Sequence, residues 1–132
     1  MSLEPYVYNA VVTSVHDGDT LRANIDLGTG IWNHGGAKTV DGMAIRLVGC
    51  NAAELGTPGG DAAAANLQAL LPAGTPIVLR SLTWDKYGGR MDADIIEVDG
   101  TDLIQQLIAE QWLAAWDGTG ERPVPPWPRT VQ

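Results

Sequence analysis

Ala10 to Gly28 has the sequence AVVTSVHDGDTLRANIDLG, and this stretch predicts how the chain begins to fold. In its second half, four apolar residues alternate with three polar ones: Leu21, Ala23, Ile25 and Leu27 against Arg22, Asn24 and Asp26. A period of two is typical of a strand with one buried face. A β-branched run from Val11 to Val15 precedes it. We therefore predict two neighbouring strands joined by a short connection.

The connection is the segment Asp17-Gly18-Asp19-Thr20. Asp-Gly between two strands indicates a tight hairpin turn, because glycine adopts a positive φ without steric cost. Turn chemistry alone accounts for Asp17 and Gly18. The turn does not require the second carboxylate, Asp19. That residue is a candidate ligand for a hard cation if other oxygens converge on it.

Length and composition predict a single domain over residues 1–132, long enough to bury a core. The hydrophobic fraction of 45% is ordinary for a globular protein. No apolar run approaches the roughly 18 residues of a membrane-spanning helix, and no signal peptide is visible, which leaves the compartment open. Cys50 is the only cysteine, so an internal disulfide is excluded. We expect a monomer with no membrane partner.

The charge balance limits how this chain could bind a polyanion. Eight basic and sixteen acidic residues give a net charge of −8. A protein that coats nucleic acid is expected to be basic. Binding to nucleic acid would therefore need a local cluster of Arg and Lys, helped by a bound cation.

Further strands and two helices are predicted along the chain. Three more strand candidates are Met43 to Cys50, Pro76 to Thr83 and Met91 to Val98, and the helix candidates are Ala62 to Leu71 and a segment from Thr101, its N-cap, to Gln111. We interpret Thr29 to Gly42, with Trp32 and His34, as an extended hairpin loop, and Thr57 to Gly60 as a loop by composition. Together these elements predict a β-rich α+β fold, a five-stranded OB-fold barrel with two to three packed helices and a Gly/Pro-rich tail over 117–132.

Polar residues gather at four places that a small barrel can bring to one rim. They are Asp17 and Asp19, then Arg46, then Asn51 to Glu54, and finally Lys86 to Arg90. Two arginines can grip a phosphate, a carboxylate can take a proton from water, and Ca²⁺ accepts carboxylate, amide and backbone oxygens. This combination points to phosphodiester hydrolysis. Each feature alone has a structural explanation, such as an ion pair between Arg46 and Glu54 or a solvated loop at 86–90.

These residues resemble the staphylococcal nuclease (thermonuclease) family over nearly the whole chain. The similar segments are Val15 to Thr20, Ile45 to Gly49, Glu54 to Gly56, Asp85 to Arg90, Asp99-Gly100 before Leu103 to Ile108, and Trp116 to Pro123. The resemblance implies an OB-fold barrel and a Ca²⁺-dependent endo/exonuclease acting on DNA and RNA. It also implies roles for individual residues: Arg46, Glu54 and Arg90 as catalytic residues with Glu54 the general base; Asp19, Asn51 and the Ala52 carbonyl as calcium ligands; Lys86, Tyr87 and Trp116 as nucleotide-binding residues.

The chain departs from the family pattern at three places. Asn51 replaces a second aspartate, which keeps an oxygen ligand and loses a charge, so Ca²⁺ binding should be weaker. Ala53 replaces a proline before Glu54, which should relax the placement of that carboxylate. An extra glycine precedes Arg90, so its match assumes a one-residue insertion.

Two other functions stay open from the sequence. One is an OB domain that binds nucleic acid or nucleotides without cutting them, which Asn51, Ala53 and the negative charge favour. The other is a protein-interaction domain that uses the Trp- and Pro-rich tail. The retained Arg46, Glu54 and Arg90 favour the nuclease, because a pure binding module has no need of the carboxylate.

Overall fold

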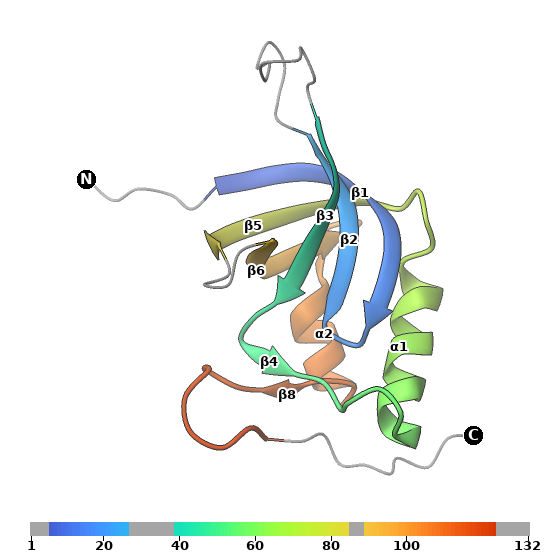
Figure 1. Ribbon diagram of the computed structural model, residues 1–132, viewed down its shortest axis with the longest axis vertical. Helices are drawn as coiled ribbons and strands as arrows, with labels where there is room; N and C mark the ends of the chain where they lie inside the picture. The colour runs from blue at the N-terminus through green and yellow to red at the C-terminus, as the bar shows by residue number, and fades with distance from the viewer. Residues whose placement is uncertain (1–5, 27–38, 85–88, 124–132) are drawn as a thin grey trace.

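The computed structural model describes residues 6–26, 39–84 and 89–123, and these form a closed five-stranded mixed barrel with two helices (Figure 1). The barrel strands are β1 (Tyr6–Asp17), β2 (Thr20–Asp26), β3 (Thr39–Leu47), β5 (Pro76–Trp84) and β6 (Arg90–Val98). Neighbouring strands pair antiparallel in the order β3-β2-β1-β5-β6. A parallel pairing between β3 and β6 closes the barrel.

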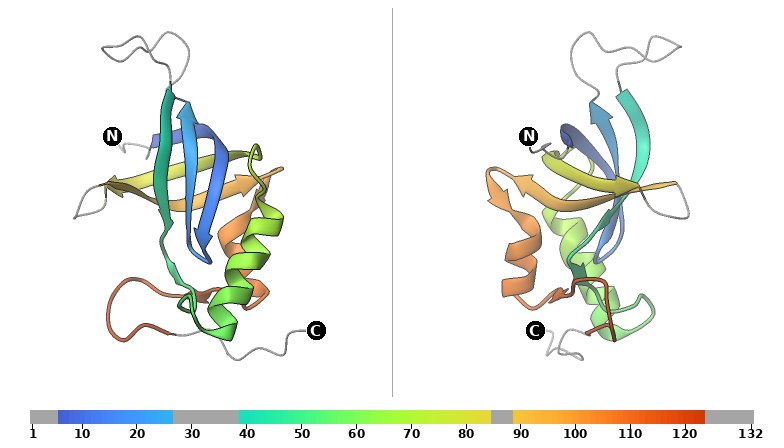
Figure 2. Two further views of the ribbon diagram at one scale, coloured as in Figure 1. Left: turned by 45° about the vertical axis from the view of Figure 1, so that its right-hand side comes forward. Right: turned by 90° about the vertical axis from the view of Figure 1, so that its left-hand side faces the viewer.

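The remaining elements are β4 (Cys50–Asn51), α1 (Pro58–Leu70), β7 (Thr101–Asp102), α2 (Leu103–Ala109) and β8 (Ala114–Ala115). Strand β7 pairs with β6 and extends the sheet. Helix α1 packs against β1, and α2 packs against β6 (Figure 2). Strands β4 and β8 form a separate two-stranded ribbon, which brings the chain after β3 beside the chain after α2.

The core fills the barrel and continues under both helices. Alternation along the strands sends every second side chain inward, as the sequence predicts. The largest fully buried side chains are Val12, Leu21, Ile25, Ile45, Leu47, Leu67, Leu71, Leu79, Ile96, Ile104, Leu107 and Leu113. Strand β1 carries two register shifts, between Val12 and Ser14 and between Val15 and Asp17, and irregularities of this kind bend a strand.

The structure confirms the β-rich α+β barrel and the positions of its five strands, and it corrects several boundaries. Helix α1 begins at Pro58, because the Thr57 side chain caps it and proline suits the first helical turn; the loop predicted at 57–60 was wrong. Helix α2 is capped by Asp102, while Thr101 lies in β7 and pairs with Val98 of β6. Strand β3 begins at Thr39, inside the predicted loop, and the rest of that loop with His34 lies outside the described residues.

Two smaller details differ from what the sequence pattern indicates. Helical spacing places Leu70 on one face with the buried Leu67 and Leu71, yet Leu70 is 38% exposed. Gly18 does not have the positive φ that we used to predict the turn. A side chain is excluded there for another reason, since a Cβ on Gly18 would lie 2.9 Å from the Ala52 Cβ and 3.1 Å from the Ala63 Cβ. Gly18 therefore permits α1 and the segment after β4 to approach the turn closely.

Candidate active site

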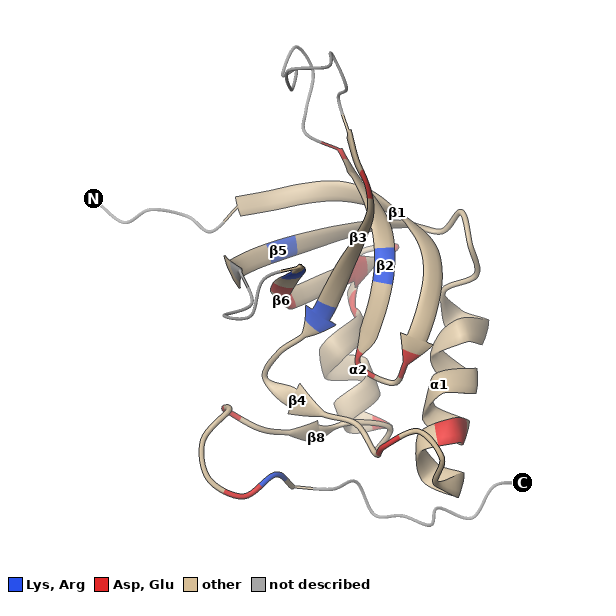
Figure 3. Cartoon of the chain, in the orientation of Figure 1, with Lys and Arg blue, Asp and Glu red and all other residues tan. Residues whose placement is uncertain are grey.

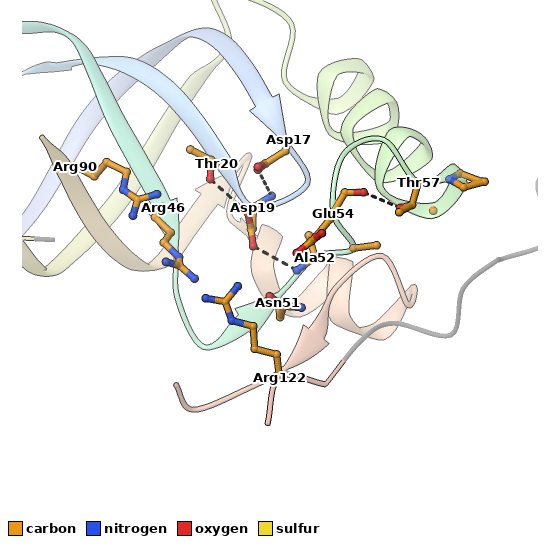
Figure 4. A pocket seen from close by; sticks show the side chains of 13 residues that line it. Asp17, Asp19, Thr20, Arg46, Asn51, Ala52, Glu54, Thr57, Arg90 and Arg122 are labelled. Atoms are coloured by element: carbon orange, nitrogen blue, oxygen red, sulfur yellow. Dashed lines mark hydrogen bonds between the residues drawn. The ribbon is translucent and has the colours of Figure 1, made fainter. Parts of the chain in front are cut away.

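A pocket of about 700 Å³ lies where the β1–β2 turn, the ends of β3 and β6, the segment after β4 and the start of α1 meet (Figure 4). Its lining residues are Asp17, Asp19, Thr20, Arg46, Asn51, Ala52, Ala53, Glu54, Thr57, Pro58, Gly59, Arg90 and Arg122. Segments far apart in the sequence thus contribute polar side chains to one cavity.

The β1–β2 turn places Asp19 at the centre of this set. Asp17 pairs with Thr20 across the turn, and the Asp17 carboxylate accepts a hydrogen bond from the Asp19 backbone N–H at 3.1 Å. The Asp19 carbonyl accepts from the Leu47 N–H at 2.8 Å, which ties the turn to the end of β3. The two Asp19 carboxylate oxygens accept from Thr20 Oγ1 and from the Ala52 N–H, each at 3.3 Å. The carboxylate is therefore held from both sides.

The environment of Asp19 disfavours its charge. Burial, followed by the hydrogen bond to and the charge of Asp17, raises the pKa of Asp19 to about 6, against smaller lowering effects of the Ala52 N–H and the Arg46 guanidinium. A partly buried carboxylate beside a second one, with raised pKa, is typical of a site that accepts a proton or a cation.

The two arginines reach the pocket from adjacent strands of the barrel. In the parallel β3–β6 pair, Ala44 lies opposite Arg90 and Arg46 lies opposite Asp92. Ile45 and Leu47 are buried in the core, so Arg46 lies on the outer face of β3. Arg90 pairs with Ala44, two residues before Arg46, and so lies on the same face of the sheet. Arg46 forms no ion pair with a carboxylate in residues 6–26, 39–84 and 89–123. The Arg46–Glu54 ion pair, the alternative structural explanation for these two residues, is thus not seen there.

Asn51 and Ala52 approach Asp19 from the β4 side. Asn51 is 7% exposed, and its Nδ2 donates a hydrogen bond to the Pro123 carbonyl at 3.1 Å. With Nδ2 bonded to the C-terminal segment, the side-chain Oδ1 is the atom of Asn51 that can serve as a ligand. Ala52 is also buried, and its small side chain contacts the Gly18 position described above.

The start of α1 holds the backbone of Glu54. Thr57 Oγ1 donates to the Glu54 carbonyl at 2.6 Å and accepts from the Gly60 N–H at 3.0 Å, so one hydroxyl both caps the helix and anchors Glu54. Gly60 packs so closely that a Cβ there would lie 1.7 Å from the Glu54 carbonyl oxygen. The Glu54 side chain itself is exposed at the pocket. This anchoring supplies rigidity at a position where the sequence, with Ala53 before it, predicts a relaxed placement.

The oxygen atoms present fit Ca²⁺ in kind. Asp19 contributes a carboxylate, Asn51 an amide oxygen and Ala52 a backbone carbonyl, all within the lining of one pocket. Burial and Asp17 raise the pKa of Asp19, and the positive charge of a bound cation would oppose both effects. Within the described part of the chain, no group of three or more His, Cys, Asp or Glu side chains is arranged to hold a metal ion. The set therefore carries a single formal negative charge, which indicates a weak site.

The structure brings six of the nine predicted site residues together. Asp19, Arg46, Asn51, Ala52, Glu54 and Arg90 all line the pocket. Trp116 lies beside it with its ring against Arg122, while Lys86 and Tyr87 lie outside the described residues. Arg122 lines the pocket and was missed, because a charged residue in a Gly/Pro-rich tail gives no periodic signal.

Compared with protein-family models and with curated proteins, the chain matches none. The nuclease resemblance thus stays a prediction. In the part of the chain that the structure describes, no helix is long and apolar enough to span a membrane.

Proposed function

We propose that this protein is a Ca²⁺-dependent nuclease that hydrolyses phosphodiester bonds of DNA or RNA. The observation that supports this most is the single pocket that contains Arg46, Glu54, Arg90, Asp19 and Asn51. These residues come from four separate segments of the chain. Their convergence on one cavity of a small barrel is expected if they act together on one ligand.

Arg46 and Arg90 are proposed to bind the scissile phosphate. Guanidiniums bind phosphate oxygens through paired N–H donors and stabilise the charge that grows on them in the transition state. Pro58 and Gly59, at the positive end of the α1 dipole, line the same pocket and also favour an anion. These groups form the local cluster that a chain with a net charge of −8 needs in order to bind a polyanion.

The distribution of the other cations agrees with this assignment (Figure 3). The five described basic residues are Arg22, Arg46, Arg80, Arg90 and Arg122. Arg80 pairs with Asp94 and lies outside the pocket, whereas three of the other four line it. Arg22 lines a smaller cavity that shares Thr20 and Arg90 with the pocket. Most of the described arginines are therefore gathered at one pocket, which they share with Asp17, Asp19 and Glu54.

Glu54 is proposed as the general base. Its exposed carboxylate takes a proton from a water molecule, the oxygen of that water bonds to phosphorus, and the bond from phosphorus to the leaving oxygen breaks. The leaving oxygen takes a proton from solvent. Arg46 and Arg90 hold the phosphate while negative charge builds on its oxygens. Asp19, Asn51 and the Ala52 carbonyl would hold Ca²⁺, which when bound supplies further positive charge at the phosphate.

We also assign the barrel to the OB type. In it, β1, β2 and β3 form a meander, and β5 and β6 return so that β3 pairs parallel with β6 and β1 pairs with β5. A five-stranded barrel of this kind is a common scaffold for oligonucleotide binding. The strand order supports the assignment, and the position of the pocket on one side of the barrel is compatible with it.

A binding module that does not cut is the second candidate. The observation in its favour is the low charge of the cation ligands, with Asn51 contributing a neutral amide that also bonds to Pro123. In that case Arg46 and Arg90 would still bind phosphate, and Glu54 would have no chemical role.

Substitution of Glu54 separates the two functions. We expect Glu54→Gln to reduce cleavage of single-stranded DNA in Ca²⁺ by at least about 100-fold, the usual scale for loss of a general base, with oligonucleotide binding retained. Glu97→Gln is the matched control, because Glu97 is an exposed β6 residue that does not line the pocket. Equal cleavage by the two variants would refute the role of Glu54.

A further inference from the structure

The C-terminal segment from Trp116 to Pro123 contributes a side chain to the pocket. Arg122 lines the cavity together with Arg46 and Arg90, although the chain reaches this point long after the barrel is complete (Figure 4). Across residues 6–26, 39–84 and 89–123, no carboxylate forms an ion pair with Arg122. A guanidinium that shares a pocket with two others, and that pairs with none of the described carboxylates, is available to bind an anionic ligand.

Trp116 fixes the start of this segment. Its backbone N–H donates to the Gly49 carbonyl at 3.0 Å, which extends the β4–β8 ribbon by one residue. Its indole Nε1–H donates to the Thr119 carbonyl at 2.8 Å, and Asp117 accepts from both the Thr119 N–H and hydroxyl. These contacts close a tight loop over residues 116–119. The Arg122 guanidinium then lies 5.2 Å from the centroid of the Trp116 ring, within cation–π range.

Asn51 fixes the other end. The Pro123 carbonyl accepts a hydrogen bond at 3.1 Å from the side chain of Asn51, which is itself almost fully buried. An aspartate at position 51 has no donor for this bond and would place a charge against a carbonyl oxygen. The segment is thus attached on both sides of Arg122, once through Trp116 and once through Pro123.

We propose that Arg122 is a third phosphate-binding residue of the pocket, and that Trp116 and Asn51 are positioning residues that hold it there. The ligand is the anionic backbone of a nucleic acid strand, which rests on the proposed function. Attachment at both ends matters because a free arginine loses rotamer entropy when it binds, and a guanidinium already held against a ring loses less. The choice of asparagine at position 51 then has a reason of its own: its amide supplies one oxygen to the pocket and one donor to the segment.

A purely structural role for Arg122 makes a different prediction. Contact with the ring of Trp116 alone would affect folding stability and leave ligand affinity unchanged. Affinity and its dependence on salt therefore separate the two roles.

The test is binding of a fluorescent single-stranded oligonucleotide to the Glu54→Gln protein, with and without Arg122→Gln, over a range of salt concentrations. We expect Arg122→Gln to weaken binding about 10-fold, equal to about 1.4 kcal/mol, and to reduce the salt slope by about 0.7, the value of one phosphate contact on a single strand. Arg80→Gln is the charge-matched control, because Arg80 pairs with Asp94 outside the pocket. Equal affinities and slopes for the two variants would overturn the proposal, as would a Glu54→Gln protein that binds no oligonucleotide.

Variants of Trp116 test the positioning role. Trp116→Phe keeps an aromatic face for Arg122 and should retain most of the affinity, whereas Trp116→Leu should approach the affinity of Arg122→Gln. These measurements are made in chelator as well as in Ca²⁺, so that the ring's effect is separated from any effect on the cation. Because binding is measured in a protein that does not cut, a missing nuclease activity leaves this test intact. Equal affinities for the Phe and Leu variants would contradict the positioning role.

Discussion

Replacing Asp19 by asparagine should stabilise the protein while removing its function. Burial and the neighbouring Asp17 raise the pKa of Asp19 from 3.8 to about 6. The folded state therefore binds this proton more tightly than the unfolded state. The contribution of Asp19 to stability is fully present below about pH 3.8 and is lost as the pH rises through about 6.

The size of the effect follows from that difference. Two pH units correspond to about 3 kcal/mol of unfolding free energy at neutral and alkaline pH. Asparagine has no charge to bury, and it can keep both contacts of the carboxylate: its Oδ1 accepts from the Ala52 N–H, and its Nδ2 donates to the Thr20 hydroxyl. Allowing for imperfect geometry, we expect Asp19→Asn to gain about 2 kcal/mol near pH 8 and close to nothing near pH 4.

Urea denaturation at the two pH values, with chelator present, measures this directly. Urea is uncharged, and the other titrating groups are common to both proteins, so the difference between them reports Asp19 together with its interaction with Asp17. Added Ca²⁺ should then stabilise the wild type at alkaline pH and leave Asp19→Asn unaffected, because a ligand that binds only the folded state raises its stability. A stability difference that does not change with pH, or a variant less stable than wild type near pH 8, would refute the reasoning.

Three further predictions concern the surroundings of the pocket. Asp17→Asn should lower the pKa of Asp19 below about 6, because it removes the Asp17 carboxylate that raises that pKa. Carboxyl NMR titration measures the pKa of Asp19, and an unchanged value would contradict the role of Asp17. Gly60→Ala should reduce nuclease activity about 100-fold, because the new Cβ must displace the Glu54 backbone and so misplace the Glu54 carboxylate relative to the phosphate. Activity near wild type would contradict the close packing. The Cys50 thiol is buried, and burial raises its pKa to about 12. It should therefore resist Ellman's reagent in the native protein and react once in concentrated urea, and rapid reaction of the native protein would show that the site opens.

Much of the barrel could be predicted because its strands alternate. The regular spacing of apolar residues in Leu21 to Ile25 survives in the structure as the buried face of β2. The closing contact could not be predicted in the same way. The pairing of β3 with β6 joins residues more than forty positions apart, and no local pattern encodes which strands become neighbours.

The errors occurred where tertiary contacts decide the conformation. Thr57 and Pro58 carry signals for a helix start, yet two glycines follow them and the composition favours a loop. The glycine at position 60 is required because the helix presses against Glu54. Gly18 likewise is small for close packing, and no turn rule reveals that.

The candidate site was predictable as a set of residue types and not as a geometry. Arg46, Glu54 and Asp19 stand out because charged residues at strand ends and turns need a reason. Arg122 does not stand out, because its position depends on two contacts from distant segments, to Trp116 and through Pro123 to Asn51. A third guanidinium in the pocket becomes visible only once those segments are placed in space.

The most direct measurement is cleavage of a single-stranded DNA by the wild-type protein at mildly alkaline pH, in millimolar Ca²⁺, in Mg²⁺ and in chelator, with binding of the same strand recorded alongside. A nuclease built on Asp19, Asn51 and Glu54 should cut in Ca²⁺ and stop cutting in chelator. Binding without cutting at saturating Ca²⁺ would contradict the proposed hydrolysis and favour the binding module. If the protein neither cuts nor binds the strand, that result would contradict a nucleic-acid function for this pocket.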